Sequence, residues 1–323
     1  MAYPIDYDAK FLQLALNLQK ATQRELDVYM RKVTRLIKLQ TRFGKIADPT
    51  LLNKQIDKVT DEYFKKFALE IRNTAGGVGA VAADQALEVV IPLLVKAKLY
   101  QEAVQLYKDI GNYAADVEKR IFSNGWAGRT LGFRLKTIQE GTQRTIQNII
   151  VNGVNEGRGA RDIAKDLRQY INPIDTESKI APLDQYRTRF GRPKNYKVPG
   201  IPRGSVQYNS YRIARTETAH IYRQSAMDFY ENRDWVKGFR WVLSPNHPKG
   251  DICDEWSRET YERAEDVPTG HPNCLCRVRP IIMTATEMRE LRFNYGDIGN
   301  PYRDEVGKFS NADLAAMVIS KKK

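Results

Sequence analysis

The stretch Asn246–Arg277 decides how the C-terminal part of this chain folds, and it reads N-H-P-K-G-D-I-C-D-E-W-S-R-E-T-Y-E-R-A-E-D-V-P-T-G-H-P-N-C-L-C-R. It contains every cysteine of the chain and two of its three histidines: His247, Cys253, His271, Cys274 and Cys276. Thiolate sulfur and imidazole nitrogen together form the ligand set that suits zinc, which binds four such donors in a tetrahedron. The stretch therefore predicts a structural zinc site made from four of these five side chains.

The spacing of the donors agrees with such a site. Cys274 and Cys276 are two positions apart, so on an extended strand both side chains point to one face. His271 precedes a proline, which keeps that turn out of a helix. The C-x₂-C pair of a zinc finger is missing, because Trp256 stands where the second cysteine would be. Two alternatives stay open: a metal-free cluster of buried thiols, or a disulfide that leaves one cysteine unpaired.

Short strands are expected on both sides of this stretch. Phe239, Trp241 and Leu243 alternate with other residues, which is the pattern of a strand that enters the module. Val278 and Ile281 indicate a second strand that leaves it. These strands predict a small β-containing C-terminal module.

A helix is expected over residues 208–233, just before the module. Arg212, Arg215 and Glu217 lie close together on it. We expect a buried arginine–glutamate pair that locks this helix in place rather than a catalytic group. His220 is interpreted as a packed or surface histidine.

Two segments carry a resemblance to a known family. The sequence W-V-L-S-P-N-H-P-K-G-D-I-C-D-E-W, followed by G-H-P-N-C-L-C-R-V-R-P, resembles the C-terminal signature of the Mu F-like minor head (head morphogenesis) proteins of tailed bacteriophages. Upstream, Arg212–Glu217 resembles the R-x-A-R-T-E helix of the same family. The resemblance covers roughly residues 114–280, and its specific part is the H-P-x-C-x-C ending.

The resemblance implies a structural role and not an enzymatic one. It implies a protein of the virion head interior, assembled in the cytoplasm of the bacterial host, that acts in head assembly and in DNA packaging or release. Its implied partners are the portal protein, the major capsid or scaffolding protein, and packaged DNA bound without sequence preference.

The first third of the chain predicts long amphipathic helices. Apolar residues keep helical spacing over residues 8–42. A second helix is expected to begin at Asp48-Pro49, which supplies an N-cap and a proline at the first helical position, and to end before Gly76. A third is expected over residues 81–108, with a kink or break at Pro92.

These patterns predict an α+β protein with mostly helical N-terminal and central regions and a small, metal-stabilised β-containing module. A glycine-punctuated junction is expected over residues 111–134, and residues 153–164 read as helix, turn and helix. That segment is more typical of a plain helical hairpin than of a DNA-reading helix-turn-helix. The expected regions are 1–110 (helical), 111–205 (helical, with a proline-rich arm), 206–290 (the module with the Cys/His residues) and 291–323 (the tail).

The charge of the chain favours a polyanionic partner. Its formal net charge is +13, and the segment from Tyr186 to Arg203 has six cations and neither Asp nor Glu. Lysine and arginine neutralise phosphates, so this arm is a candidate nucleic-acid contact; docking to an acidic protein and a solvated loop are the alternatives. The cations are Arg187, Arg189, Arg192, Lys194, Lys197 and Arg203.

Several enzyme classes and a membrane span are disfavoured by the residues present. The zinc-deaminase signature, the H-E-x-x-H motif and the phosphate-binding G-x-x-x-x-G-K-[ST] motif are all missing. The enzyme rival that remains is a metal-dependent nuclease of the His-Asn-His kind, for which Asn246-His247 and His271-x-Asn273 give some basis. The N-terminal residues lack the apolar core of a signal peptide, and no apolar run approaches the roughly 20 residues that a membrane span needs.

Overall fold

The structure is a computed structural model that describes residues 7–100, 102–103, 105–106, 108–110, 113, 130–173, 203–244, 247–248 and 250–294. Long helices form its body: α1 (Tyr7–Leu39), α2 (Pro49–Lys96), α4 (Leu131–Asn155), α5 (Ala160–Ile171) and α6 (Val206–Tyr230). A two-stranded hairpin of β1 (Thr41–Arg42) and β2 (Lys45–Ile46) joins α1 to α2. The C-terminal module then contains β3 (Val236–Val242), α7 (Ile252–Trp256), β4 (Thr260–Tyr261), η2 (Ala264–Asp266) and β5 (Arg277–Ile282), and α8 (Ala285–Asn294) follows it. The predicted α+β class, mostly helical with a small sheet, is confirmed.

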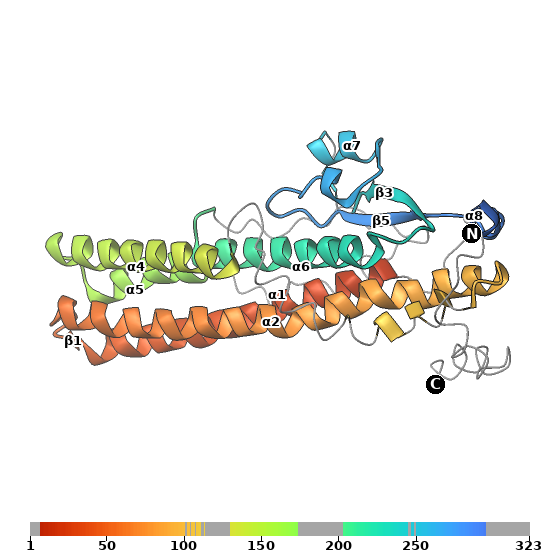
Figure 1. The fold of residues 1–323 in the computed structure, drawn as a ribbon. Helices are drawn as coiled ribbons and strands as arrows, with labels where there is room; N and C mark the ends of the chain where they lie inside the picture. Colours follow the sequence, from red (N-terminus) through yellow and green to blue (C-terminus); the bar gives the residue numbers. More distant parts are fainter. Residues whose placement is uncertain are drawn as a thin grey trace.

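The helices form an elongated body. Figure 1 shows α1 and α2 side by side along its length, α4 and α6 following one another above them, and the module lying against α6. The main hydrophobic core runs between these helices and includes Ile56 and Phe67 of α2, Ile146 of α4, Ile163 of α5 and Ile213 of α6. One core thus joins segments that lie more than a hundred residues apart in the chain.

Side-chain caps set where the helices begin. Asp48 caps α2 by accepting a hydrogen bond from the Leu51 backbone amide at 2.8 Å, and a proline occupies the first turn. Ser205 caps α6 in the same way, with its hydroxyl oxygen 3.1 Å from the Tyr208 amide. The predicted start of the second helix at Asp48-Pro49 is confirmed.

The predicted end of that helix before Gly76 is wrong, and so is the predicted break at Pro92. A single helix, α2, runs through both positions as far as Lys96. Each mid-helix glycine costs about 1 kcal/mol relative to alanine, but the neighbouring Ala75 and Val78 are fully buried, and this packing outweighs the local preference. Pro92 lies little more than one turn before the helix ends.

The helical hairpin predicted over residues 153–164 is formed by α4 and α5. Its turn passes through Gly157, whose φ of +70° favours glycine. The two helices approach closely at Gly153, because a Cβ atom added there would lie 2.7 Å from Cγ1 of Ile163. The apolar face of α5 enters the main core.

The module is built on a three-stranded antiparallel sheet in the order β4-β3-β5. Both strands predicted around the Cys/His residues are therefore present, as β3 and β5. In β3, Phe239 and Trp241 are buried on the core side, opposite Pro280 and Val278 of β5. Gly238 allows the close approach of β4, because its φ is +144° and a Cβ there would lie 2.4 Å from the Tyr261 carbonyl oxygen.

Three sequence predictions are not tested by the structure. The glycine-rich junction and the C-terminal tail lie almost entirely outside the described residues, and the division of the chain into four regions stays a prediction. Within the described segments, no helix is both long enough and apolar enough to cross a membrane.

Candidate metal centre

The five predicted donors converge in the module from two stretches of chain. His247 and Cys253 come from the connection between β3 and β4, with Cys253 in the short helix α7. His271, Cys274 and Cys276 come from the loop that enters β5. All three thiols are buried, and none forms a disulfide. We call these five residues the Cys/His cluster.

One triad within the cluster is formed by Cys253, His271 and Cys274. The Cys253 Sγ atom lies 3.6 Å from Cys274 Sγ and 3.3 Å from His271 Nε2. The other ring nitrogen of His271, Nδ1, lies 3.1 Å from the Pro272 carbonyl oxygen. A proton on Nδ1 would be donated to that oxygen, which leaves Nε2 without a proton. Nε2 lies 3.0 Å from Asp251 Oδ2 as well as 3.3 Å from Cys253 Sγ.

A second triad is formed by His247, Cys253 and Cys276, and it shares Cys253 with the first. The Cys276 Sγ atom lies 3.7 Å from His247 Nδ1. The opposite nitrogen, Nε2, is buried and lies 3.1 Å from Asp254 Oδ1, but without the alignment of a hydrogen bond.

These separations are those of zinc ligands. Zn–S bonds of about 2.3 Å and Zn–N bonds of about 2.0–2.1 Å place tetrahedral donor atoms roughly 3.4–3.8 Å apart. The three measured separations, 3.3, 3.6 and 3.7 Å, lie at or close to this range. Each triad therefore places three donor atoms at distances close to those of zinc ligands, and the cluster could hold a metal ion.

No known protein family, curated protein or solved structure matches this chain. Its site is accordingly defined by its own residues and their geometry.

Backbone amides support the sulfur atoms. The Ser244 amide lies 3.4 Å from Cys276 Sγ, and the Cys276 amide lies 3.3 Å from Cys274 Sγ. The pKa of the Cys274 thiol is lowered, first because the Cys253 thiol donates a hydrogen bond to it, and also through the Arg223 charge. The pKa of Cys253 is raised for the complementary reason.

Arg223 of α6 is a positive charge buried beneath the cluster, and it was not among the residues predicted from the sequence. Its side chain is 1% exposed. It donates hydrogen bonds to the carbonyl oxygens of Cys276, at 2.9 Å, and Thr269, at 3.1 Å, and lies 5.4 Å from the centre of the Trp241 ring. Burial lowers the pKa of this guanidinium, and the neighbouring cysteine charges oppose that effect. The sequence offered one signal for Arg223, which is its spacing from Arg215: it lies about two helical turns further along α6.

The loop of the cluster is also bound to α6 at a second place. The Asn273 amide donates to the Thr216 hydroxyl at 2.8 Å, and an Arg215 guanidinium nitrogen lies 3.5 Å from the Asn273 carbonyl oxygen. The loop and the helix thus hold each other in register.

The predicted arginine–glutamate pair exists, but its arginine is a different one. Glu217 pairs with Arg134 of α4 at 2.5 Å, whereas Arg212 on the same helix as Glu217 is exposed. Burial raises the pKa of Glu217, and the Arg134 charge opposes this. The predicted histidine, His220, is packed, with 7% of its surface exposed.

Of the six cations in the predicted nucleic-acid arm, the structure describes one. Arg203 is exposed in the turn before α6. The other five cations, from Arg187 to Lys197, lie outside the described residues.

Proposed function

We propose that this chain is a structural minor head protein of a tailed bacteriophage, whose C-terminal module is held in shape by one zinc ion. The observation that carries the proposal is the direct contact between the two segments on which the family resemblance rests. The H-P-N-C-L-C loop and the R-I-A-R-T-E helix bind each other through Asn273 and Thr216. Such a contact is expected of two parts of one folding unit and would be a coincidence if either match were accidental.

The charge of the surroundings favours three cysteines and one histidine as the ligand set. Zinc with three thiolates and one neutral imidazole has a net charge of −1, and Arg223 supplies a buried positive charge beside it. Two thiolates and two imidazoles would form a neutral site and leave that cation unbalanced, which is costly in a buried position. Cys253, Cys274 and Cys276 are then the sulfur ligands.

His271 is the better fourth ligand. Its Nδ1 atom is engaged by the Pro272 carbonyl oxygen, and its Nε2 atom is the closer of the two histidine nitrogens to a sulfur atom. His247 then lies beside the zinc site, next to Asp254.

Four protein ligands, three of them buried cysteines, support a structural role. Structural zinc sites have four protein ligands, whereas catalytic ones keep a position open for water or substrate. The cluster supplies more donors than a tetrahedron needs, and its sulfur atoms are shielded from solvent. A nuclease would instead need a free histidine base beside a metal-bound phosphate.

The proposed partners follow from the same reading. The portal protein, and the major capsid or scaffolding protein, would dock on the exposed charged faces of the long helices. Packaged DNA would be bound without sequence preference by exposed lysine and arginine side chains. The protein would lie inside the virion head.

Copurification with the portal tests the proposal. The chain is co-expressed with the portal protein of the same phage, and the expected result is a complex of the two on size exclusion. In parallel, plasmid DNA is incubated with the purified chain and Mg²⁺, Mn²⁺ or Zn²⁺, and no nicking is expected. Metal-dependent nicking that disappears in His271→Ala but persists in Arg189→Ala would instead establish the nuclease.

A further inference from the structure

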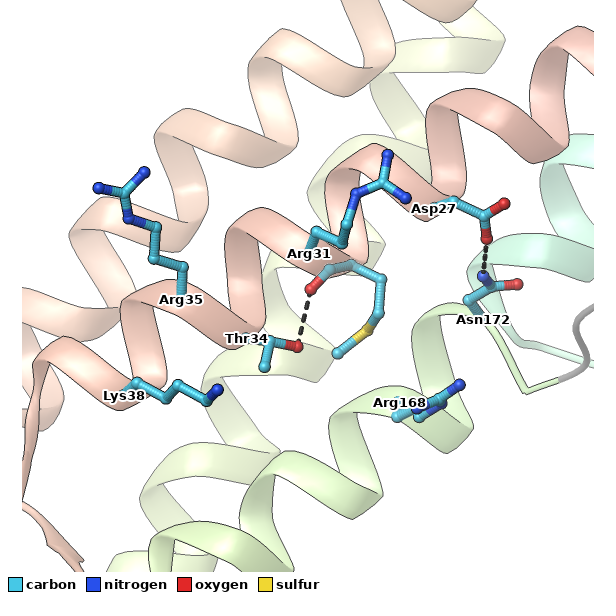
Figure 2. A pocket seen from close by; sticks show the side chains of 8 residues that line it. Asp27, Arg31, Thr34, Arg35, Lys38, Arg168 and Asn172 are labelled. Atoms are coloured by element: carbon cyan, nitrogen blue, oxygen red, sulfur yellow. Dashed lines mark hydrogen bonds between the residues drawn. The ribbon is translucent and has the colours of Figure 1, made fainter.

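A polar groove lies between α1 and α5, at a distance from the Cys/His cluster. Its volume is about 630 Å³. Figure 2 shows its lining, with Arg31, Arg35 and Lys38 on α1 and Arg168 on α5. The lining residues are Asp27, Met30, Arg31, Thr34, Arg35, Lys38, Arg168 and Asn172. We call this the α1–α5 groove.

The four cations of the groove are available to a ligand. Arg31, Arg35, Lys38 and Arg168 are exposed, and none of them forms an ion pair with any residue in the described part of the chain. Elsewhere in the body, exposed cations do find carboxylates, as Lys32 does with Glu62 at 2.7 Å. The three cations of α1 are three or four positions apart and so lie along one side of the helix, over a length of about 10 Å.

The one carboxylate in the groove is held by amides. Asp27 Oδ1 accepts hydrogen bonds from Asn172, at 2.7 Å, and from Gln23, at 2.9 Å (Figure 2 draws the first of these). Gln23 belongs in turn to a buried network with Gln207 and Tyr211. This network holds Asp27 in place, and Asp27 forms no ion pair with the groove cations.

We propose that the α1–α5 groove binds the phosphate backbone of DNA. A phosphate chain needs a line of cations and little else, because its contacts fix position without reading bases. A protein partner would need an apolar anchor at the centre of the contact. Among its described lining residues the groove offers no such anchor, since the one apolar side chain there, Met30, is 8% exposed. DNA is therefore favoured over an acidic protein.

The groove residues are not those of the predicted arm, and the inference deepens the proposed function by placing a DNA contact on the helices α1 and α5. The inference stands on the groove residues alone. It would survive if the chain failed to bind the portal.

The test compares two triple variants of the full-length protein. Arg31→Gln/Arg35→Gln/Lys38→Gln removes three groove charges, and Lys54→Gln/Lys58→Gln/Lys65→Gln removes three exposed charges from α2. Both lower the formal net charge from +13 to +10. Binding to a short duplex and to a single strand of DNA is measured at several salt concentrations, and a polyglutamate peptide serves as the probe for an acidic protein. Circular dichroism confirms that each variant is folded.

The groove variant is expected to flatten the log–log salt dependence of duplex binding by about 2–3, which corresponds to three lost phosphate contacts. The α2 variant is expected to change it by less than about 1, and Arg31→Lys/Arg35→Lys is expected to keep most of the slope. Equal losses in the two triple variants would mean that only net charge matters and would overturn the proposal. A groove variant that loses polyglutamate binding and keeps DNA binding would assign the groove to an acidic protein.

Discussion

Arg223 is a buried cation next to the Cys/His cluster, so the cost of burying it depends on the charge of that cluster. A buried guanidinium costs several kcal/mol unless charge and hydrogen bonds compensate it. Carbonyl oxygens of Thr269 and Cys276 supply hydrogen bonds, and negative charge comes first from the cysteines and to a smaller extent from Glu217. Packing is equally tight here, because a Cβ on Gly270 would lie 2.7 Å from a guanidinium nitrogen of Arg223.

We expect Arg223→Met to weaken zinc binding by about 10- to 100-fold, the usual effect of removing a residue that supports metal ligands. Removal of the cation leaves a net negative zinc site buried without a counter-charge. Competition with a chromophoric chelator measures the affinity. Arg233→Met, which removes a partly exposed arginine paired with Asp109, is the matched control and should not change it. Equal affinities in Arg223→Met and the wild type would refute the charge-balance argument.

At the level of elements, the α4–α5 hairpin depends on one missing side chain. Gly153→Ala would place a methyl group 2.7 Å from Ile163, and overpacking of this kind costs about 1–3 kcal/mol in the free energy of unfolding. Urea denaturation measures the loss, and Ile163→Ala in the same chain should reduce the penalty of the Gly153 change. Gly141→Ala, in the same helix but with open space around it, should stabilise the protein by up to about 1 kcal/mol.

Loss of zinc is expected to unfold the module together with the end of α2. Cys253, Cys274 and Cys276 share a hydrophobic cluster with Val90 and Leu94, so the loss of the metal removes support on both sides. Hydrogen exchange after chelation, or in Cys274→Ala, should show lost protection in β3, β5 and residues 90–96. Protection should persist in α4 and α5, which pack in the main core. Unchanged exchange in β3 and β5 would mean that the thiols form a metal-free core.

At the level of the whole molecule, the helices depend on partners far away in the chain. Tyr63 of α2 hydrogen-bonds Ser210 of α6 at 2.7 Å, and Gln139 of α4 reaches Asp61 of α2 at 2.6 Å. A fragment of residues 1–113 would therefore expose apolar faces that α4, α5 and α6 cover in the full chain. We expect limited proteolysis to degrade this fragment much faster than the same residues in the full-length protein. Equal protection would show that α1 and α2 form a self-sufficient hairpin.

Features that depend on residues close together in the chain could be predicted from the sequence. Features that depend on contacts between distant segments could not. Helical spacing, the Asp48 cap and the composition of the Cys/His cluster are local, and they are found in the structure as predicted. The continuity of α2 through Gly76 depends on packing against other helices. The partner of Glu217 lies on α4, and Arg223 meets the cluster only when α6 packs against the module. The α1–α5 groove combines two helices whose closeness no local pattern reveals.

Because α2 is one unbroken helix, it fixes a long distance within the molecule. At 1.5 Å per residue, its 48 residues span about 72 Å. Near one end stands the hairpin that carries the fully exposed Phe43, and near the other end the helix packs against the C-terminal module. The separation between these two points is therefore set by the residue count of a single helix. If the two ends contact different neighbours in an assembly, the number of residues in α2 sets the distance between those neighbours.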